Sequence, residues 1–168
     1  MDRWRVPFGA TLESGLAAHD GCSLSVRRRT SEYKKGTTMD KEEKVRAFSD
    51  FLRQEGYVPT VDEDGDIRLK IQGRTYYVIF DDKDELFFRV IFPNFWGIES
   101  DDERIKVERA ALKATAETKV AKVFTVRENT WATVEIFSSS VDNAQKIFSR
   151  SVSALQTAVR TFADEMNG

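Results

Sequence analysis

Apolar and polar residues alternate with a period of two through residues 67–71, where three aliphatic side chains are separated by Arg68 and Lys70. This period is typical of a β-strand with one face against the core and the other in water. Gln72-Gly73 predicts a tight turn directly after it. Residues 67–71 are therefore expected to belong to a meander of antiparallel strands.

The next two segments, 74–80 and 86–92, are apolar on both sides of the predicted strand. In the first, Tyr77 and Ile79 oppose the other apolar residues, and in the second Phe87 and Ile91 do so. A strand that is apolar on both faces has to be covered twice, by helices or by another subunit. This excess of apolar surface predicts a face that binds a partner.

Helical periodicity predicts three helices in the same part of the chain. The first begins at Asp40, which forms a capping-box pattern with Glu43, and ends near Gly56. The second covers about 101–118, and the third runs from Asp142 close to the end of the chain. Further strands are expected at 57–61, 120–126 and 131–137.

The predicted element order is α-β-β-β-β-α-β-β-α. Because the strands follow one another in hairpins rather than alternating with helices, the fold class is α+β. We expect three helices and an antiparallel sheet of about five to six strands, built from a meander plus a hairpin. Residues 39–168 are expected to form this single domain.

The predicted second helix has two apolar faces. At 100° per residue, Ile105 and Leu112 lie on one side, and Val107, Ala111 and Ala114 lie nearly opposite. A face of small residues allows another backbone to approach closely, either a neighbouring helix or a second subunit. Helix propensity alone also explains the alanines.

Residues 1–38 differ from the rest of the chain in charge and in pattern. They hold seven basic against four acidic residues, whereas residues 39–168 hold nineteen against twenty-four. We expect a disordered extension, or a start codon assigned upstream of Met39 as the true initiator. The alternative is a basic arm around Arg27-Arg28-Arg29 and Lys34-Lys35 that touches a partner. The acidic balance of 39–168 predicts no nucleic-acid partner.

The single cysteine, Cys22, and the single histidine, His19, both lie before Met39. One cysteine cannot form a disulfide within the chain, which is typical of a reducing compartment and favours a cytoplasmic location. No apolar run approaches the roughly 20 residues that a membrane-spanning helix needs, so no membrane association is predicted.

Catalytic motifs are missing from residues 39–168. Without histidine or cysteine, this part offers neither the usual nucleophile systems nor a Cys/His zinc site, and no phosphate-binding glycine pattern occurs. The acidic run from Asp62 fails as a calcium loop because its sixth and twelfth positions hold Ile67 and Gly73. This run and the acidic turn 81–85 are interpreted as solvated turns, without the desolvation that raises a carboxyl pKa. We therefore expect no enzyme, no metal and no cofactor.

Aromatic residues gather around Phe95 and Trp96, after the predicted fourth strand. They can close one end of the core, or they can form a hydrophobic recess for a partner. A small-molecule sensor is a second hypothesis, and an enzyme that uses paired carboxylates is a third. The ligand of such a sensor would lie among Tyr76, Phe88, Phe95, Trp96 and Trp131.

Three runs resemble a known family: residues 94–104, then Thr118-Lys119-Val120-Ala121-Lys122-Val123, then Trp131-Ala132-Thr133-Val134-Glu135. Over about 40–166 the chain is similar to the YbjN family of bacterial sensory transduction regulators. The resemblance implies a fold like that of type III secretion chaperones, which often dimerise and bind extended client segments along apolar patches. It implies no catalytic residues.

These observations predict a non-catalytic, protein-binding regulator or chaperone-like adaptor of the YbjN type. We expect it to form a homodimer and to bind a further protein. The residues predicted to bind protein are Tyr77, Ile79, Phe87, Ile91, Phe95, Trp96, Val107, Ala111 and Ala114.

Overall fold

The structure, a computed structural model, describes residues 39–168. The expected α+β class and the expected order of elements are both confirmed, whereas the expectations for residues 1–38 fall outside the described part of the chain. The elements are α1 Lys41–Gln54, β1 Thr60–Val61, β2 Ile67–Ile71, β3 Arg74–Phe80, β4 Phe87–Gly97, α2 Asp101–Glu117, β5 Ala121–Val126, β6 Asn129–Phe137 and α3 Val141–Asn167.

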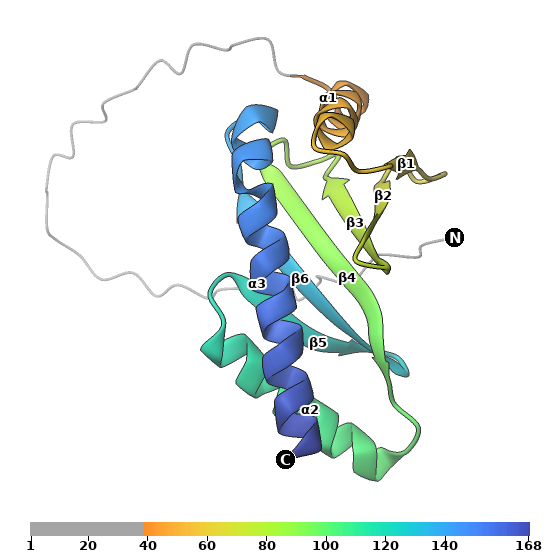
Figure 1. Cartoon of the computed structure of the whole chain (residues 1–168), viewed down its shortest axis with the longest axis vertical. Helices are drawn as coiled ribbons and strands as arrows, with labels where there is room; N and C mark the ends of the chain where they lie inside the picture. The colour runs from red at the N-terminus through yellow and green to blue at the C-terminus, as the bar shows by residue number, and fades with distance from the viewer. Residues whose placement is uncertain (1–38) are drawn as a thin grey trace, which may run out of the picture. The chain divides into compact units, whose positions relative to one another are not determined.

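The six strands form one antiparallel sheet in the order β1-β2-β3-β4-β6-β5 (Figure 1). The meander β1–β4 and the hairpin β5–β6 join through β4 and β6, so β4 lies near the middle of the sheet. The predicted strand 57–61 is reduced to Thr60–Val61. Tyr57 still donates its N–H to Leu52 O at the end of α1, and Pro59 has no N–H to give to a ladder.

Helix α1 begins as the sequence predicts. Glu43 donates its N–H to Asp40 Oδ1 at 2.8 Å, and Asp40 donates its own N–H to Glu43 Oε2 at 3.2 Å. This reciprocal pair is a capping box, which satisfies two backbone donors that the first turn would otherwise leave unpaired. The cap fixes where α1 starts, and its apolar residues Val45, Phe48 and Leu52 form the buried face.

The core lies between the three helices and one face of the sheet (Figure 1). Phe48 of α1 is fully buried at its centre, and its ring lies 5.6 Å from the rings of Phe80 on β3 and Phe148 on α3, both edge to face. Edge-to-face pairs place the positive rim of one ring against the negative face of another. One aromatic side chain therefore joins the first helix, the sheet and the last helix.

Helix α2 packs its small residues against α3 and β5. The sequence left open whether the alanine face of α2 contacts a neighbouring helix or a second subunit. In the structure it contacts a neighbouring helix, α3. Lys113 strengthens this contact with an ion pair to Glu165 of α3 at 2.7 Å, and the pair lowers the pKa of Glu165. The opposite side of α2 is exposed, with Ile105 at 69% and Leu112 at 72% accessibility.

A bulge interrupts β4 opposite Trp131. The register runs from Phe92↔Ala132 directly to Trp96↔Thr130, so three residues of β4 lie opposite one residue of β6. Asn94 takes a left-handed conformation there (φ 52°), and its Oδ1 accepts a hydrogen bond from Trp131 Nε1 at 2.8 Å. A bulge re-aims the side chains that follow it, and Phe95 lies against the core, 5.2 Å from the ring of Phe162 on α3.

Candidate functional site

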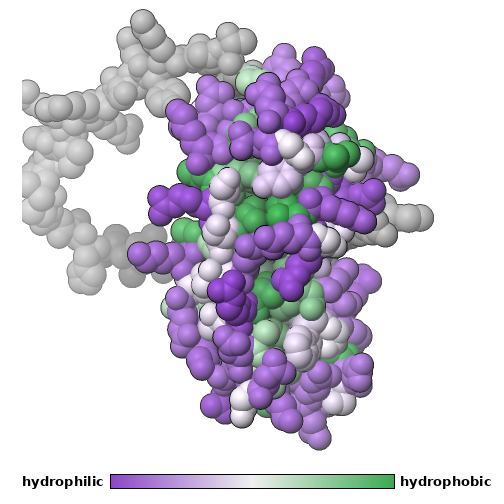
Figure 2. All heavy atoms as spheres, viewed as in Figure 1, coloured by the Kyte–Doolittle hydropathy of each residue, from purple (hydrophilic) through white to green (hydrophobic). Residues whose placement is uncertain are grey.

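The second face of the sheet has no helix on it among residues 39–168. Figure 2 views the protein from the helix side, where hydrophilic residues form most of the surface and hydrophobic ones show mainly in the middle. On the far side, Ile91 and Trp131 are buried but stand outside the core cluster that the three helices share. We call this side the helix-free face; its strand residues are Arg68, Lys70, Thr75, Tyr77, Ile79, Phe87, Arg89, Ile91, Lys122, Phe124, Trp131, Thr133, Glu135 and Phe137.

One row of residues crosses this face from β2 to β5. The register pairs Arg68 with Tyr77, Tyr77 with Ile91, Ile91 with Thr133, and Thr133 with Lys122. Because residues paired in register project to the same side of the sheet, the five side chains form a line across it. The line has a basic residue at each end and aromatic, aliphatic and hydroxyl groups between them.

Apolar side chains flank this row on both sides. Phe87 and Phe137 pair across β4 and β6 with ring centroids 6.2 Å apart, and Phe137 is 73% exposed. Phe124 and Trp131 form a second cross-strand pair with centroids 6.4 Å apart. An aromatic ring exposed to that extent on a sheet is typical of a contact surface rather than of a core.

Basic side chains outnumber acidic ones on the helix-free face. Arg89 is an ion-pair partner of Glu135 at 3.8 Å, Lys122 contacts the same carboxylate, and burial lowers the pKa of Arg89. Arg68 and Lys70 are exposed and form no ion pair with any described residue. With four basic side chains against one carboxylate, this face is positive although the described chain as a whole is acidic.

The structure brings four of the predicted binding residues together on this face. They are Tyr77, Ile79, Phe87 and Ile91. The first three are half-buried, whereas Ile91 is fully buried and, like the α2 residues below, is not accessible in the subunit as described. Sequence reasoning missed Phe124 and Phe137, which the alternation of β5 and β6 would have assigned to the same side once the hairpin was placed beside β4.

The other five predicted residues lie elsewhere. Phe95 and Trp96 are half-buried against Phe162, so they close one end of the core. The three α2 residues are buried against α3 and β5 and are not accessible in the subunit as described. These are Val107 at 0%, Ala111 at 4% and Ala114 at 0% exposure.

The five aromatics expected around a small ligand are not brought together. Tyr76 and Phe88 are buried on the helix-covered face, where Tyr76 stacks on Phe92 at 4.8 Å. Trp131 lies on the opposite face of the same sheet. Since the sheet itself separates these rings, they cannot line one common pocket.

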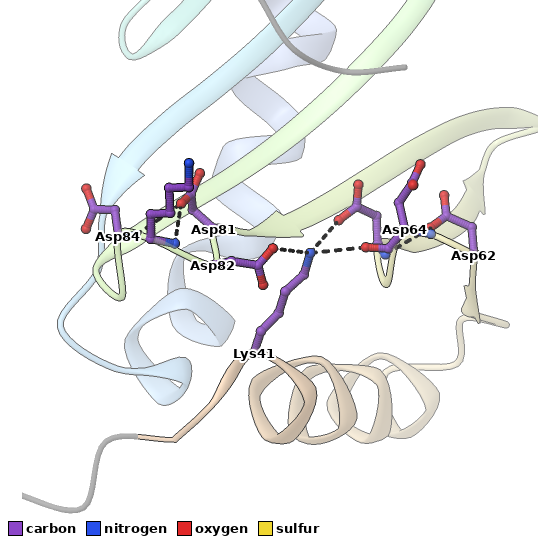
Figure 3. Close-up of polar contacts among 8 residues, drawn as sticks. Lys41, Asp62, Asp64, Asp81, Asp82 and Asp84 are labelled. Atoms are coloured by element: carbon purple, nitrogen blue, oxygen red, sulfur yellow. Dashed lines mark hydrogen bonds and ion pairs between the residues drawn. The ribbon is translucent and has the colours of Figure 1, made fainter. Parts of the chain in front are cut away.

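A second polar site lies where α1 meets two acidic loops (Figure 3). Lys41 Nζ donates to Asp64 O at 3.1 Å and lies 3.6 Å from both Asp66 Oδ1 and Asp82 Oδ2. Lys44 Nζ donates to Glu85 O at 2.8 Å. A groove of about 940 Å³ runs along this junction, with side chains of both charges on its walls. The two lysines thereby attach the helix to the β1–β2 and β3–β4 loops.

The expectation that every acidic turn is solvated is wrong at Asp66. Its side chain is only 6% exposed, and burial raises its pKa from 3.8 to about 6, although nearby Lys41 acts in the opposite direction. Asp66 directly precedes the buried start of β2, and its carboxylate lies 3.6 Å from Nζ of Lys41 on α1. Asp62 keeps the turn role that was expected, because its Oδ1 accepts from the N–H groups of Asp64 and Asp66.

Among the described residues, no group of three or more histidine, cysteine, aspartate or glutamate side chains is placed to hold a metal ion. None of the helices in 39–168 is long and apolar enough to cross a membrane. The chain matches no protein-family model, and neither a curated protein nor a solved structure matches it. Functional inference therefore depends on the geometry described above.

Proposed function

We propose that this protein is a non-catalytic, protein-binding regulator or chaperone-like adaptor of the YbjN type, which binds its partner on the helix-free face. The observation that carries the proposal is the pair Phe87–Phe137, aromatic and partly exposed on a sheet face that no described helix covers. Exposed apolar groups of this kind lose unfavourable hydration when a partner covers them. A cytoplasmic location, favoured by the single cysteine, belongs to the same proposal.

Site-specific photo-crosslinking tests the surface. A benzophenone amino acid replaces Phe137, and in a control protein it replaces Lys146, which is exposed on α3. We expect one discrete adduct from Phe137 in the cells that make this protein, and none of that mass from Lys146. The adduct partner, once purified, should bind the native chain and lose affinity for Phe137→Ser. Equal adducts at both positions, or none at Phe137, would contradict the proposal.

We also propose that the chain forms a homodimer, for which the exposed stripe of α2 is the best-placed surface. Ile105 and Leu112 are seven residues apart on one helical face, and Arg109 between them is 82% exposed. Light scattering after size-exclusion chromatography should give twice the chain mass for the native protein. The double variant Ile105→Asp/Leu112→Asp should give the monomer mass, and a native monomer at high concentration would end this part of the proposal.

A further inference from the structure

A short hairpin covers the edge of the sheet beside α1. Residues 60–65 hold strand β1 and the turn that leads into β2. We infer that these residues form a strap that closes over Asp66 and opens when Asp66 carries its negative charge. This movement lies within one subunit, so it goes beyond the proposed function and its test requires no partner.

The strap is held to the domain by short and mostly polar interactions. Strand β1 has only two residues, Thr60 and Val61, both exposed, and β2 is its one partner strand in the sheet of residues 39–168. Thr60 Oγ1 lies 3.4 Å from Arg68 O, and Lys41 Nζ donates to Asp64 O at 3.1 Å. Opening the strap therefore exposes little apolar surface, which is typical of a segment that opens locally.

The two ends of the strap suit such a movement. Pro59 before it and Ile67 after it are buried and belong to the packed domain. Gly65 has a φ of 76°, a conformation that glycine adopts without steric cost, at the point where the strap leads back into the sheet. Its N–H donates to Asp62 O at 3.1 Å within the turn. The strap can thus move as one unit and keep this hydrogen bond.

Asp66 makes the closed position depend on charge. Its side chain is only 6% exposed, and Oδ1 accepts no hydrogen bond from a described residue, since Lys41 Nζ lies 3.6 Å away. A buried carboxylate without a hydrogen bond has a higher free energy than one in water. Burial accordingly raises the pKa of Asp66 to about 6 while the strap is closed. An open strap returns this side chain to water.

Charged groups approach Asp66 from several elements: Lys41 of α1, Asp62 and Asp64 of the strap, Arg89 of β4, and Asp82 of the β3–β4 loop, which shares Lys41. The ammonium group of Lys41 favours the charged carboxylate and so opposes opening. Burial and the two strap carboxylates disfavour it, and their combined effect is larger because the pKa is raised. Opening should therefore increase as pH rises.

Opening changes the edge of the sheet. In the closed position β1 pairs with Ile67 and Arg68 of β2. Without β1, the backbone groups of this part of β2 have no partner, and β2 becomes an edge with which an extended chain can pair. The strap also forms one wall of the groove along α1, where Lys41 lies between the two acidic loops (Figure 3). The strap would thus cover this edge in acid and expose it more often at neutral pH.

Hydrogen–deuterium exchange of the full chain between about pH 4 and pH 7 tests the strap, after correction for the intrinsic pH dependence of exchange. Peptides that cover residues 60–68 report the β1–β2 ladder. Their opening constant should rise by up to about a hundredfold and level off above pH 6, because Asp66 has a pKa of 3.8 in water and about 6 under the closed strap. Peptides that cover residues 87–92 of β4 should stay far more protected at every pH.

Variants assign the effect to Asp66. Asp66→Asn should abolish the rise and leave residues 60–68 more protected at pH 7 than in the native chain. Lys41→Met should increase opening at pH 7, since it removes the charge that favours the closed carboxylate. Asp82→Asn, which removes an exposed carboxylate beside the same lysine, should retain the rise. If Asp66→Asn does not fold, the pH series of the native chain decides.

Three results would overturn the inference. Residues 60–68 that are as well protected as β4 mean that this edge opens only when the whole domain unfolds. Protection of 60–68 that does not change with pH in the native chain means that Asp66 does not control the strap. Equal loss of protection in residues 46–54 of α1 means that the helix moves instead of the strap.

Discussion

Thr115 on α2 bonds to both backbone groups of Val123 on the edge strand β5. Its hydroxyl accepts the N–H of Val123 at 2.8 Å and donates to the carbonyl oxygen of the same residue at 3.2 Å. An edge strand otherwise presents such groups to any extended chain that arrives. One side chain therefore blocks strand addition at the middle of β5, which supports the proposal that a partner binds a face of the sheet and not this edge.

Thr115→Val should destabilise the protein while keeping its shape. The isosteric change leaves two part-buried backbone groups without a hydrogen bond, which costs about 1–3 kcal/mol. The matched control is Thr157→Val on α3, where an exposed hydroxyl donates to Ser153 O within its own helix. Urea unfolding measures both variants, and equal midpoints for the two would show that the hydroxyl of Thr115 contributes nothing.

Asp66 should make stability depend on pH between about 4 and 6. Because its pKa is raised to about 6 in the folded protein, the folded state binds a proton more tightly there than the unfolded state does. The unfolding free energy should therefore fall as pH rises through this window. Asp66→Asn should remove that dependence and gain stability relative to the native chain as pH rises. Asp82→Asn, which removes an exposed carboxylate beside the same lysine, should retain it.

Lys41 should hold down the pKa of Asp66. Its ammonium group favours the charged carboxylate, whereas burial and the neighbouring Asp62 and Asp64 disfavour it. In Lys41→Met the pKa of Asp66 should rise further, which the carboxyl carbon shift in an NMR titration measures directly. Lys113→Met, at the distant ion pair with Glu165, is the control and should leave Asp66 unchanged. A lower or unaltered value in Lys41→Met would contradict the assignment.

Truncation of two phenylalanines should change the unfolding free energy by very different amounts. Phe48→Ala opens a cavity among rings of α1, β3 and α3 and should cost about 3–5 kcal/mol. Phe137→Ala, at an exposed position on the helix-free face, should change stability by less than about 0.5 kcal/mol. Denaturant unfolding gives both values. A large loss for Phe137→Ala would show that this ring supports the fold rather than a contact.

The sequence was sufficient for the fold because its local signals agreed with one another. The capping box at Asp40, the alternation in 67–71 and the two-faced strand 74–80 each appear in the structure as predicted. Two-fold alternation also identified Tyr77 and Ile79 as members of one face. Such patterns depend only on neighbours in sequence, which is why they can be recognised from the chain alone.

Features that depend on pairing between distant segments could not be predicted in the same way. Periodicity showed that α2 has two apolar sides, but which side meets α3 depends on tertiary packing. The side with the small residues packs against α3 because small side chains allow the two helices to approach closely. The burial of Asp66 depends on α1 lying above it. The positive charge of the helix-free face emerges only when Arg68 on β2 and Lys122 on β5, which are far apart in sequence, are placed on the same face of the sheet.

Charge separation within the domain has a kinetic consequence. The acidic loops held by Lys41 and Lys44 lie at one end of the sheet, while Arg68, Lys70, Arg89 and Lys122 lie on its helix-free face, so the described domain has surfaces of opposite charge. A charged partner would be attracted toward the surface of opposite sign before it makes contact. Association would then be fast at low ionic strength and slow as salt is added, with much less effect on how long the complex lasts once it has formed.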